Sequence, residues 1–122
     1  MTLYHFTSPK HIHSVLRDGL SMGHVPISVN PPKLRSGYQW LTTNPQWEQS
    51  WNTTTNLDYD RTAYRLTISI PRIARSKLIK WMPHGKRLVK PHAWRALTRD
   101  CTPKDWVLFK GIVRPQWFDA VD

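Results

Sequence analysis

The segment from Ala63 to Ile70 alternates apolar and polar side chains. Its apolar positions are Tyr64, Leu66, Ile68 and Ile70. Because a β-strand points successive side chains to opposite faces, this pattern predicts a strand with one buried face and one solvent-facing face. Pro71 follows directly and predicts where the strand ends. The fold must therefore contain a sheet and a second layer that covers its apolar face.

A strand followed by a helix is predicted at the start of the chain. Thr2 to Thr7 reads as a short strand. Ser8 and Pro9 suit the cap and the first position of a helix, and Gly19 suits its end. Between them, one apolar stripe is formed by Ile12, Val15 and Leu16. His5 is therefore expected at a strand end, at the mouth of a strand–turn–helix unit where small ligands often bind.

The remaining segments predict further strands joined by connections of irregular length. Ser21 to Gly37, which is rich in proline, reads as an irregular loop; Tyr38 to Thr42 reads as a strand; and Asn44-Pro45 reads as the start of a second helix. Residues 73–81 favour either a short helix or an irregular crossing segment, and residues 105–113 favour a strand. The 122 residues fit a single α+β domain, 1–122, with mainly antiparallel pairing.

Positive charge dominates the composition, with 18 Lys and Arg against 8 Asp and Glu and a net charge of +10. No acidic residue occurs between Asp60 and Asp100. The basic residues of that window are Arg61, Arg65, Arg72, Arg75, Lys77, Lys80, Lys86, Arg87, Lys90, Arg95 and Arg99. Such a block favours an anionic partner, which could be nucleic acid, an acidic protein or a phosphate-rich small molecule, although a solvated surface gives the same composition.

Cysteine usage and hydropathy indicate a cytoplasmic protein without a membrane span. Cys101 is the single cysteine, so no internal disulfide forms, as expected in a reducing compartment. No run approaches the roughly 18 apolar residues of a transmembrane helix. His11 and His13 do not share a helix face, and no spacing of His, Cys and Asp resembles a zinc site, so no metal is expected.

Three segments together resemble the ADP-ribosyltransferases of the diphtheria-toxin and poly(ADP-ribose) polymerase type. YHFTSPKHIHSVLRDGL (4–20) resembles the first motif of that family, a Tyr-His-Gly-Thr-like strand end before a helix that closes on Gly-Leu. GYQWLTTNPQWEQSW (37–51) is similar to the second motif, and KDWVLFKG (104–111) to the third. The resemblance implies an ADP-ribosyltransferase-like fold of split antiparallel β-sheets with short flanking helices, which clasps NAD in a central cleft.

The same resemblance implies the roles of the site residues. His5 would hydrogen-bond a ribose hydroxyl of the adenosine half, and the acidic residue of the third motif, Asp105, would bind the nicotinamide ribose and favour the transition state. The implied NAD-binding residues are His5, Thr7, Trp40, Thr42, Trp47 and Trp51. One tryptophan would stack on nicotinamide, with Trp40 ranked first, then Trp51, then Trp47.

The chain departs from the family pattern at two positions. The catalytic acid of the family is a glutamate, whereas the only glutamate here, Glu48, lies in the second motif and Asp105 occupies the matching position. An error of order 1 Å in a catalytic group costs about 100-fold in rate. The stacking tyrosine of the family falls on Leu41, and Trp40 points to the opposite face unless a bulge intervenes.

Two functions of different classes remain open. The first is an NAD-dependent ADP-ribosyltransferase that modifies a nucleic-acid or protein target, in the manner of a toxin or phage accessory protein. The second is a catalytically inactive relative that binds nucleic acid, a nucleotide or an acidic protein through its basic face. The expected anion-binding residues are Arg72, Arg75, Lys77, Lys80, Lys86, Arg87, Lys90, Arg95 and Arg99. RNA 2′-phosphate chemistry on a related fold ranks last, because the chain lacks a matching set of arginine and histidine motifs.

Overall fold

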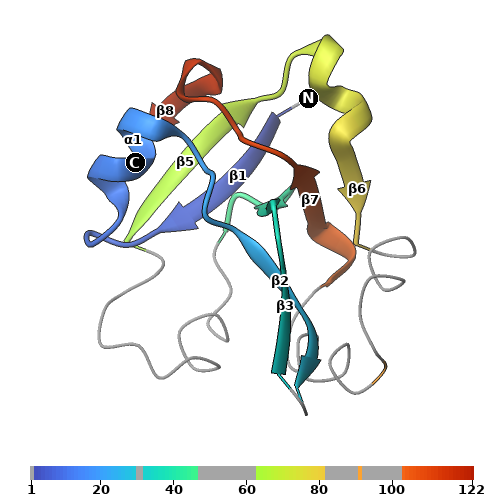
Figure 1. The fold of residues 1–122 in the computed structure, drawn as a ribbon. Coiled ribbons are helices and arrows are strands. Elements are labelled where there is room, and N and C mark those ends of the chain that lie inside the picture. Colours follow the sequence, from blue (N-terminus) through green and yellow to red (C-terminus); the bar gives the residue numbers. More distant parts are fainter. Residues whose placement is uncertain (1, 30–31, 47–62, 82–90, 92–102) are drawn as a thin grey trace.

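A six-stranded antiparallel sheet with the order β6-β7-β4-β1-β5-β8 forms the body of the protein (Figure 1). The computed structural model describes residues 2–29, 32–46, 63–81, 91 and 103–122. The strands of the sheet are β1 (Thr2–Thr7), β4 (Tyr38–Thr42), β5 (Tyr64–Ser69), β6 (Leu78–Lys80), β7 (Trp106–Lys110) and β8 (Phe118–Val121). The expected mixed α+β fold with mainly antiparallel pairing is confirmed for this part of the chain.

Short helices and a hairpin complete the described structure. The helices are α1 (Ile12–Asp18) and the 3-10 segments η1 (Arg72–Lys77), η3 (Pro103–Asp105) and η4 (Pro115–Trp117). The hairpin consists of β2 (His24–Val29) and β3 (Pro32–Ser36), which pair as a separate two-stranded sheet. Figure 1 shows this hairpin extending from the body of the protein, away from α1 and β8.

The alternating pattern of β5 buries one face of the sheet. Leu66 and Ile68 are fully buried, and β5 pairs with β1 so that Leu3 lies opposite Ile68. Ile12 of α1 and Ala74 of η1 belong to the same apolar cluster. The layer that the alternation requires is therefore supplied by α1 and by the crossing segments η1 and η4, which also contributes Trp117.

A second apolar cluster occupies the opposite face of the sheet. Leu108 and Trp106 alternate along β7 with the residues that face the first cluster, and Trp81 follows β6. The ring centroids of Trp81 and Trp106 are 6.2 Å apart. Val25 of the hairpin is fully buried in this cluster. The two faces of the sheet thus have separate cores, one aliphatic and one rich in indole rings.

Two sequence predictions are wrong: the proline-rich segment 21–37 contains strands, and the first helix begins later than Ser8 and Pro9 suggest. Residues 21–37 were expected to form an irregular loop, yet they contain β2 and β3. An isolated two-stranded pair offers edge positions at which proline loses no ladder bond, so Pro26 does not exclude a strand. The first helix begins at Ile12, because Ser8 accepts bonds from the amides of His11 and Ile12 through its carbonyl and its side chain caps nothing.

The remaining elements agree with the sequence in part. The strands predicted at residues 38–42 and 63–70 are confirmed as β4 and β5. Residues 72–80 form η1 and then β6, so the crossing segment is 3-10 helix followed by a short strand. Leu16, expected in the apolar stripe, is 40% exposed. The second helix was predicted to start at Pro45; residues 45 and 46 form bends, and the rest of it lies outside the described residues.

Candidate functional site

His5 lies within β1, where its side chain reaches across to the neighbouring strand. Its Nδ1 is 2.7 Å from the backbone oxygen of Trp40 on β4, and the residue is half-buried. A backbone carbonyl only accepts hydrogen bonds, so Nδ1 carries the proton and donates it. In the neutral imidazole Nε2 is then an acceptor, which is the form that suits the hydroxyl group of a sugar.

β1 and β4 part from one another beside this histidine. The two strands register at one residue pair, Tyr4 with Thr42, whereas β1 and β5 register along the whole of β1. The bond from His5 to the carbonyl of Trp40 lies on the side of that pair toward the end of β1. A side chain thus bridges the sheet where the ladder between β1 and β4 stops.

Asp105 lies at the start of β7, as the last residue of η3. Its carbonyl oxygen accepts hydrogen bonds from the amide of Thr43 at 3.0 Å and from the Thr43 hydroxyl at 3.4 Å. The residue is half-buried, and no ion pair between described residues includes it. Its backbone is therefore tied to the end of β4, and the carboxylate stands at the junction of η3 and β7.

The candidate residues of the three motifs fall on three adjacent strands. Tyr4 of β1 lies opposite Thr42 of β4, and Thr42 lies opposite Trp106 of β7. His5 follows one end of this row and Asp105 precedes the other. With strands about 4.8 Å apart and a rise of about 3.3 Å per residue, their Cα atoms are roughly 12 Å apart. This separation is within the length of one extended ligand.

The turn after β1 contains a buried hydroxyl that the sequence did not single out. Ser8 is 2% exposed, and its Oγ has no hydrogen-bond partner among the described residues. Thr7, the expected small polar residue of the first motif, is also buried and lies next to it. The sequence predicts that Ser8 caps the first helix, and only the structure shows that its Oγ makes no capping hydrogen bond.

Trp40 packs on the face of the sheet opposite His5. β4 and β7 keep a regular register from Tyr38 to Thr42, with no bulge that would turn Trp40 toward His5. Its ring centroid lies 5.0 Å from that of Trp81 and 5.5 Å from that of Trp106, and its Nε1 donates to the backbone oxygen of His24 at 3.0 Å. The indole belongs to the second core cluster. Trp47 and Trp51 lie outside the described residues.

Thr42, the residue of β4 that registers with Tyr4 of β1, is buried and also stabilises the turn that follows β4. Its Oγ1 accepts a hydrogen bond from the amide of Asn44 at 3.0 Å, which turns the chain directly after β4. The Asn44 side chain in turn accepts one from the amide of Gln46 at 2.9 Å. The strand of the second motif, β4, is therefore followed by a capped turn next to Asp105, whose carbonyl accepts a hydrogen bond from the amide of the intervening Thr43.

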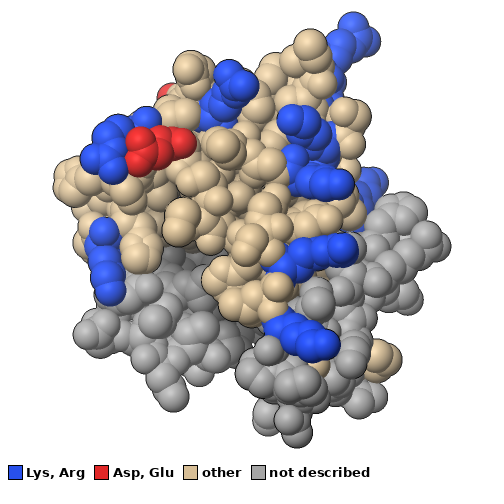
Figure 2. All heavy atoms as spheres, in the orientation of Figure 1, with Lys and Arg blue, Asp and Glu red and all other residues tan. Residues whose placement is uncertain are grey.

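The basic residues of η1 and β6 are exposed on the surface. Four of the expected anion-binding residues are described, and all four are exposed: Arg72, Arg75, Lys77 and Lys80. The remaining ones, Lys86, Arg87, Lys90, Arg95 and Arg99, lie outside the described residues. Figure 2 shows Lys and Arg side chains spread over this face of the protein, while acidic side chains show near α1 and β8. Arg65 differs, because it pairs with Asp122 at 2.7 Å.

No family model, curated protein or solved structure matches the chain. Among the described residues, no three His, Cys, Asp or Glu side chains are grouped so that they could hold a metal ion. None of the helices in the described ranges is long and apolar enough to cross a membrane.

Proposed function

We propose that the protein is an NAD-dependent ADP-ribosyltransferase whose site lies at the split between β1 and β4. The observation that carries this proposal is the placement of His5 on β1, Thr42 on β4 and Asp105 directly before β7, close to the single registered pair of β1 and β4. This arrangement suits the split-sheet architecture that the three sequence motifs imply. Local propensity alone gives no reason for these three motifs to converge, because they come from distant parts of the chain.

The polar groups at the split fit NAD as a substrate. His5 would accept a hydrogen bond from a ribose hydroxyl through Nε2, because its Nδ1 donates to the carbonyl of Trp40. Stacking on the nicotinamide would come from a residue other than Trp40, since that indole packs in the second core.

Asp105 would act on the ribose that carries nicotinamide. Breaking the bond between nicotinamide and its ribose leaves positive charge on the sugar, and a fixed carboxylate stabilises that charge more in the transition state than in the ground state. The hydrogen bonds from Thr43 to the carbonyl of Asp105 hold the residue in place against β4. An aspartate held in this way would substitute for the glutamate of the family.

The test is the release of nicotinamide from NAD by the purified protein, in the presence of cell lysate with and without nuclease. We expect release to fall at least 100-fold in Asp105→Asn, which keeps the shape of the side chain and removes its charge. Asp105→Glu is expected to retain release, because it restores the acid of the family. Asp18→Asn, an exposed aspartate on α1, is the matched control. Equal release by Asp105→Asn and the wild-type protein would refute the assignment.

A second candidate is a non-catalytic binder of polyanions. The observation in its favour is that Arg72, Arg75 and Lys77 of η1 are exposed and that no ion pair joins them to a described carboxylate. Such side chains are available to phosphate or carboxylate groups. This candidate predicts salt-sensitive affinity for a polyanion and no nicotinamide release, so the assay above separates it from the enzyme.

A further inference from the structure

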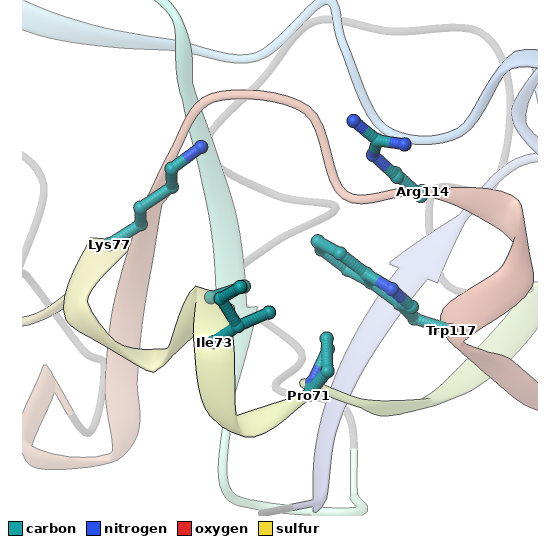
Figure 3. A pocket seen from close by; sticks show the side chains of 6 residues that line it. Pro71, Ile73, Lys77, Arg114 and Trp117 are labelled. Atoms are coloured by element: carbon teal, nitrogen blue, oxygen red, sulfur yellow. The ribbon is translucent and has the colours of Figure 1, made fainter.

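A pocket lies between η1 and η4, separate from the residues at the β1–β4 split. It has a volume of about 410 Å³, within the range of small-ligand sites. The residues that line it are Pro71, Ile73, Ala74, Lys77, Arg114 and Trp117. In Figure 3, Ile73 and Trp117 extend toward one another across the pocket, and the cationic groups of Lys77 and Arg114 lie above them, Lys77 on the left and Arg114 on the right. One wall is thus apolar and the other positive.

The apolar wall of the pocket is rigid at Trp117 and open at Ile73. Trp117 packs against the fully buried Phe109 with ring centroids 5.6 Å apart and an interplanar angle of 74°. Ile73 is 91% exposed, which is unusual for a large aliphatic side chain that borders a pocket. A flat ligand placed between them would bury Ile73 and contact an indole that is already fixed by the core.

The positive wall has no acidic counterpart in the described residues. The ion pairs among the described residues join Arg17 to Asp18 and Arg65 to Asp122. Neither pair includes Lys77 or Arg114. No Asp or Glu among the described residues lines the pocket. A ligand that contacts both walls therefore combines a flat apolar ring with an anionic group.

We propose that this pocket binds one nucleotide of a single-stranded nucleic acid, with the base between Ile73 and Trp117 and a phosphate at Lys77 and Arg114. Cations continue beyond the pocket at Arg72, Arg75 and Lys80, as a chain of phosphates requires. An isolated pocket of this volume admits an unpaired base, whereas a base inside a duplex does not leave its stack without cost. The inference rests on the second candidate function and does not depend on NAD chemistry.

The experiment measures fluorescence anisotropy of a labelled single-stranded oligodeoxythymidylate of about 12 nucleotides, a length that one single-strand-binding domain spans. We expect Kd to rise several-fold in Ile73→Ser, a change at an exposed side chain that leaves the core intact. Trp117→Leu is expected to raise Kd at least about 5-fold, since stacking on an aromatic ring contributes that much per base. Thermal melting of each variant confirms that it remains folded.

Salt dependence tests the positive wall. The double variant Lys77→Gln/Arg114→Gln is expected to reduce the slope of log K against log salt by about 1.4, or about 0.7 for each lost phosphate contact. Lys33→Gln/Arg35→Gln, which removes the same charge from exposed positions on β3, is the matched control and is expected to leave Kd for the oligonucleotide within about 2-fold, because its cations lie on the separate hairpin.

The outcomes separate the pocket from the broader binding function. If the wild-type protein shows no salt-sensitive affinity for the oligonucleotide, the pocket assignment is wrong; if it also binds neither a duplex nor polyglutamate, the second candidate function is wrong as well. If it binds but the pocket variants match the β3 control, only the pocket assignment is wrong. Equal affinity for polyglutamate would overturn the nucleic-acid assignment in favour of an acidic protein, and equal affinity for a duplex would overturn the unpaired base.

Discussion

Gly19, directly after α1, is held in a position that no other residue can occupy without disruption. Its φ is 82° and its ψ is −174°, a conformation accessible almost exclusively to glycine. A Cβ atom at this position would lie 2.3 Å from the backbone oxygen of Val113. The substitution Gly19→Ala must therefore both strain the chain and push the segment after β7 away.

The cost of Gly19→Ala can be worked out from the contacts around it. Positive φ costs a residue with a side chain about 1–2 kcal/mol. Displacing Val113 also disturbs its bridge to Leu20, in which two backbone bonds of 2.9 Å and 3.0 Å join the two residues. Each such bond contributes about 1 kcal/mol. We therefore expect Gly19→Ala to lower the free energy of unfolding by about 3–4 kcal/mol.

Gly37 provides the matched control for this prediction. Its φ is 91°, yet a Cβ there would meet no atom within 4 Å, so Gly37→Ala carries the strain of positive φ and no clash. We expect a loss of about 1–2 kcal/mol for that variant. Urea unfolding followed by tryptophan fluorescence measures both. Equal losses in the two variants would show that the close approach to Val113 contributes nothing to stability.

Three further predictions concern the cores and the surface. Gln39→Leu removes two hydrogen bonds, from the amide of Gly23 at 2.9 Å and to the carbonyl of Gly111 at 3.0 Å, and is expected to cost about 2–4 kcal/mol in a urea titration; a loss below about 1 kcal/mol contradicts this role. Trp81→Ala is expected to cost about 3–5 kcal/mol and to weaken the near-ultraviolet circular dichroism of the indole cluster. The hydrogen bond from Arg17 lowers the pKa of Asp18 in the folded protein. The pair therefore stabilises the fold at pH values above the ordinary carboxyl pKa, and this contribution is lost as the pH falls through the lowered pKa of Asp18. Carboxyl titration by NMR should show that pKa rise in Arg17→Gln, and an unchanged titration contradicts the pairing.

The parts of the fold that the sequence predicts are those fixed by local pattern. The alternation in β5 predicts both a strand and its buried face, because Leu66 and Ile68 are separated by the two-residue period of a strand. The hairpin β2–β3 was not predicted because its prolines suggest a loop. The pairing of the two strands, in which Pro26 lies opposite Leu34, shows that this segment is extended. β8 carries two large apolar residues, Phe118 and the exposed Val121, and is defined by its pairing with β5.

The candidate site depends on contacts between distant segments, which limits what the sequence can reveal. The motifs identify His5, Thr42 and Asp105 as candidate residues, but the sheet order alone shows that β1, β4 and β7, which carry or follow them, are neighbours. The orientation of Trp40 followed from strand alternation, and the regular register of β4 leaves its ring in the second core. The unpartnered Oγ of Ser8 became visible only because α1 begins three residues later than its cap signal suggests.

The most direct test of the proposed NAD site observes the ring nitrogens of His5 by NMR in protein labelled with ¹⁵N-histidine, with the His5 signals assigned by their absence in His5→Gln. The bond to the carbonyl of Trp40 predicts that Nδ1 carries the proton in the free protein. Addition of NAD is then expected to shift the Nε2 signal of His5 while leaving that of His13, an exposed histidine on α1, unchanged. An Nε2 signal of His5 that does not respond to saturating NAD would contradict the assignment of the split between β1 and β4 as an NAD site.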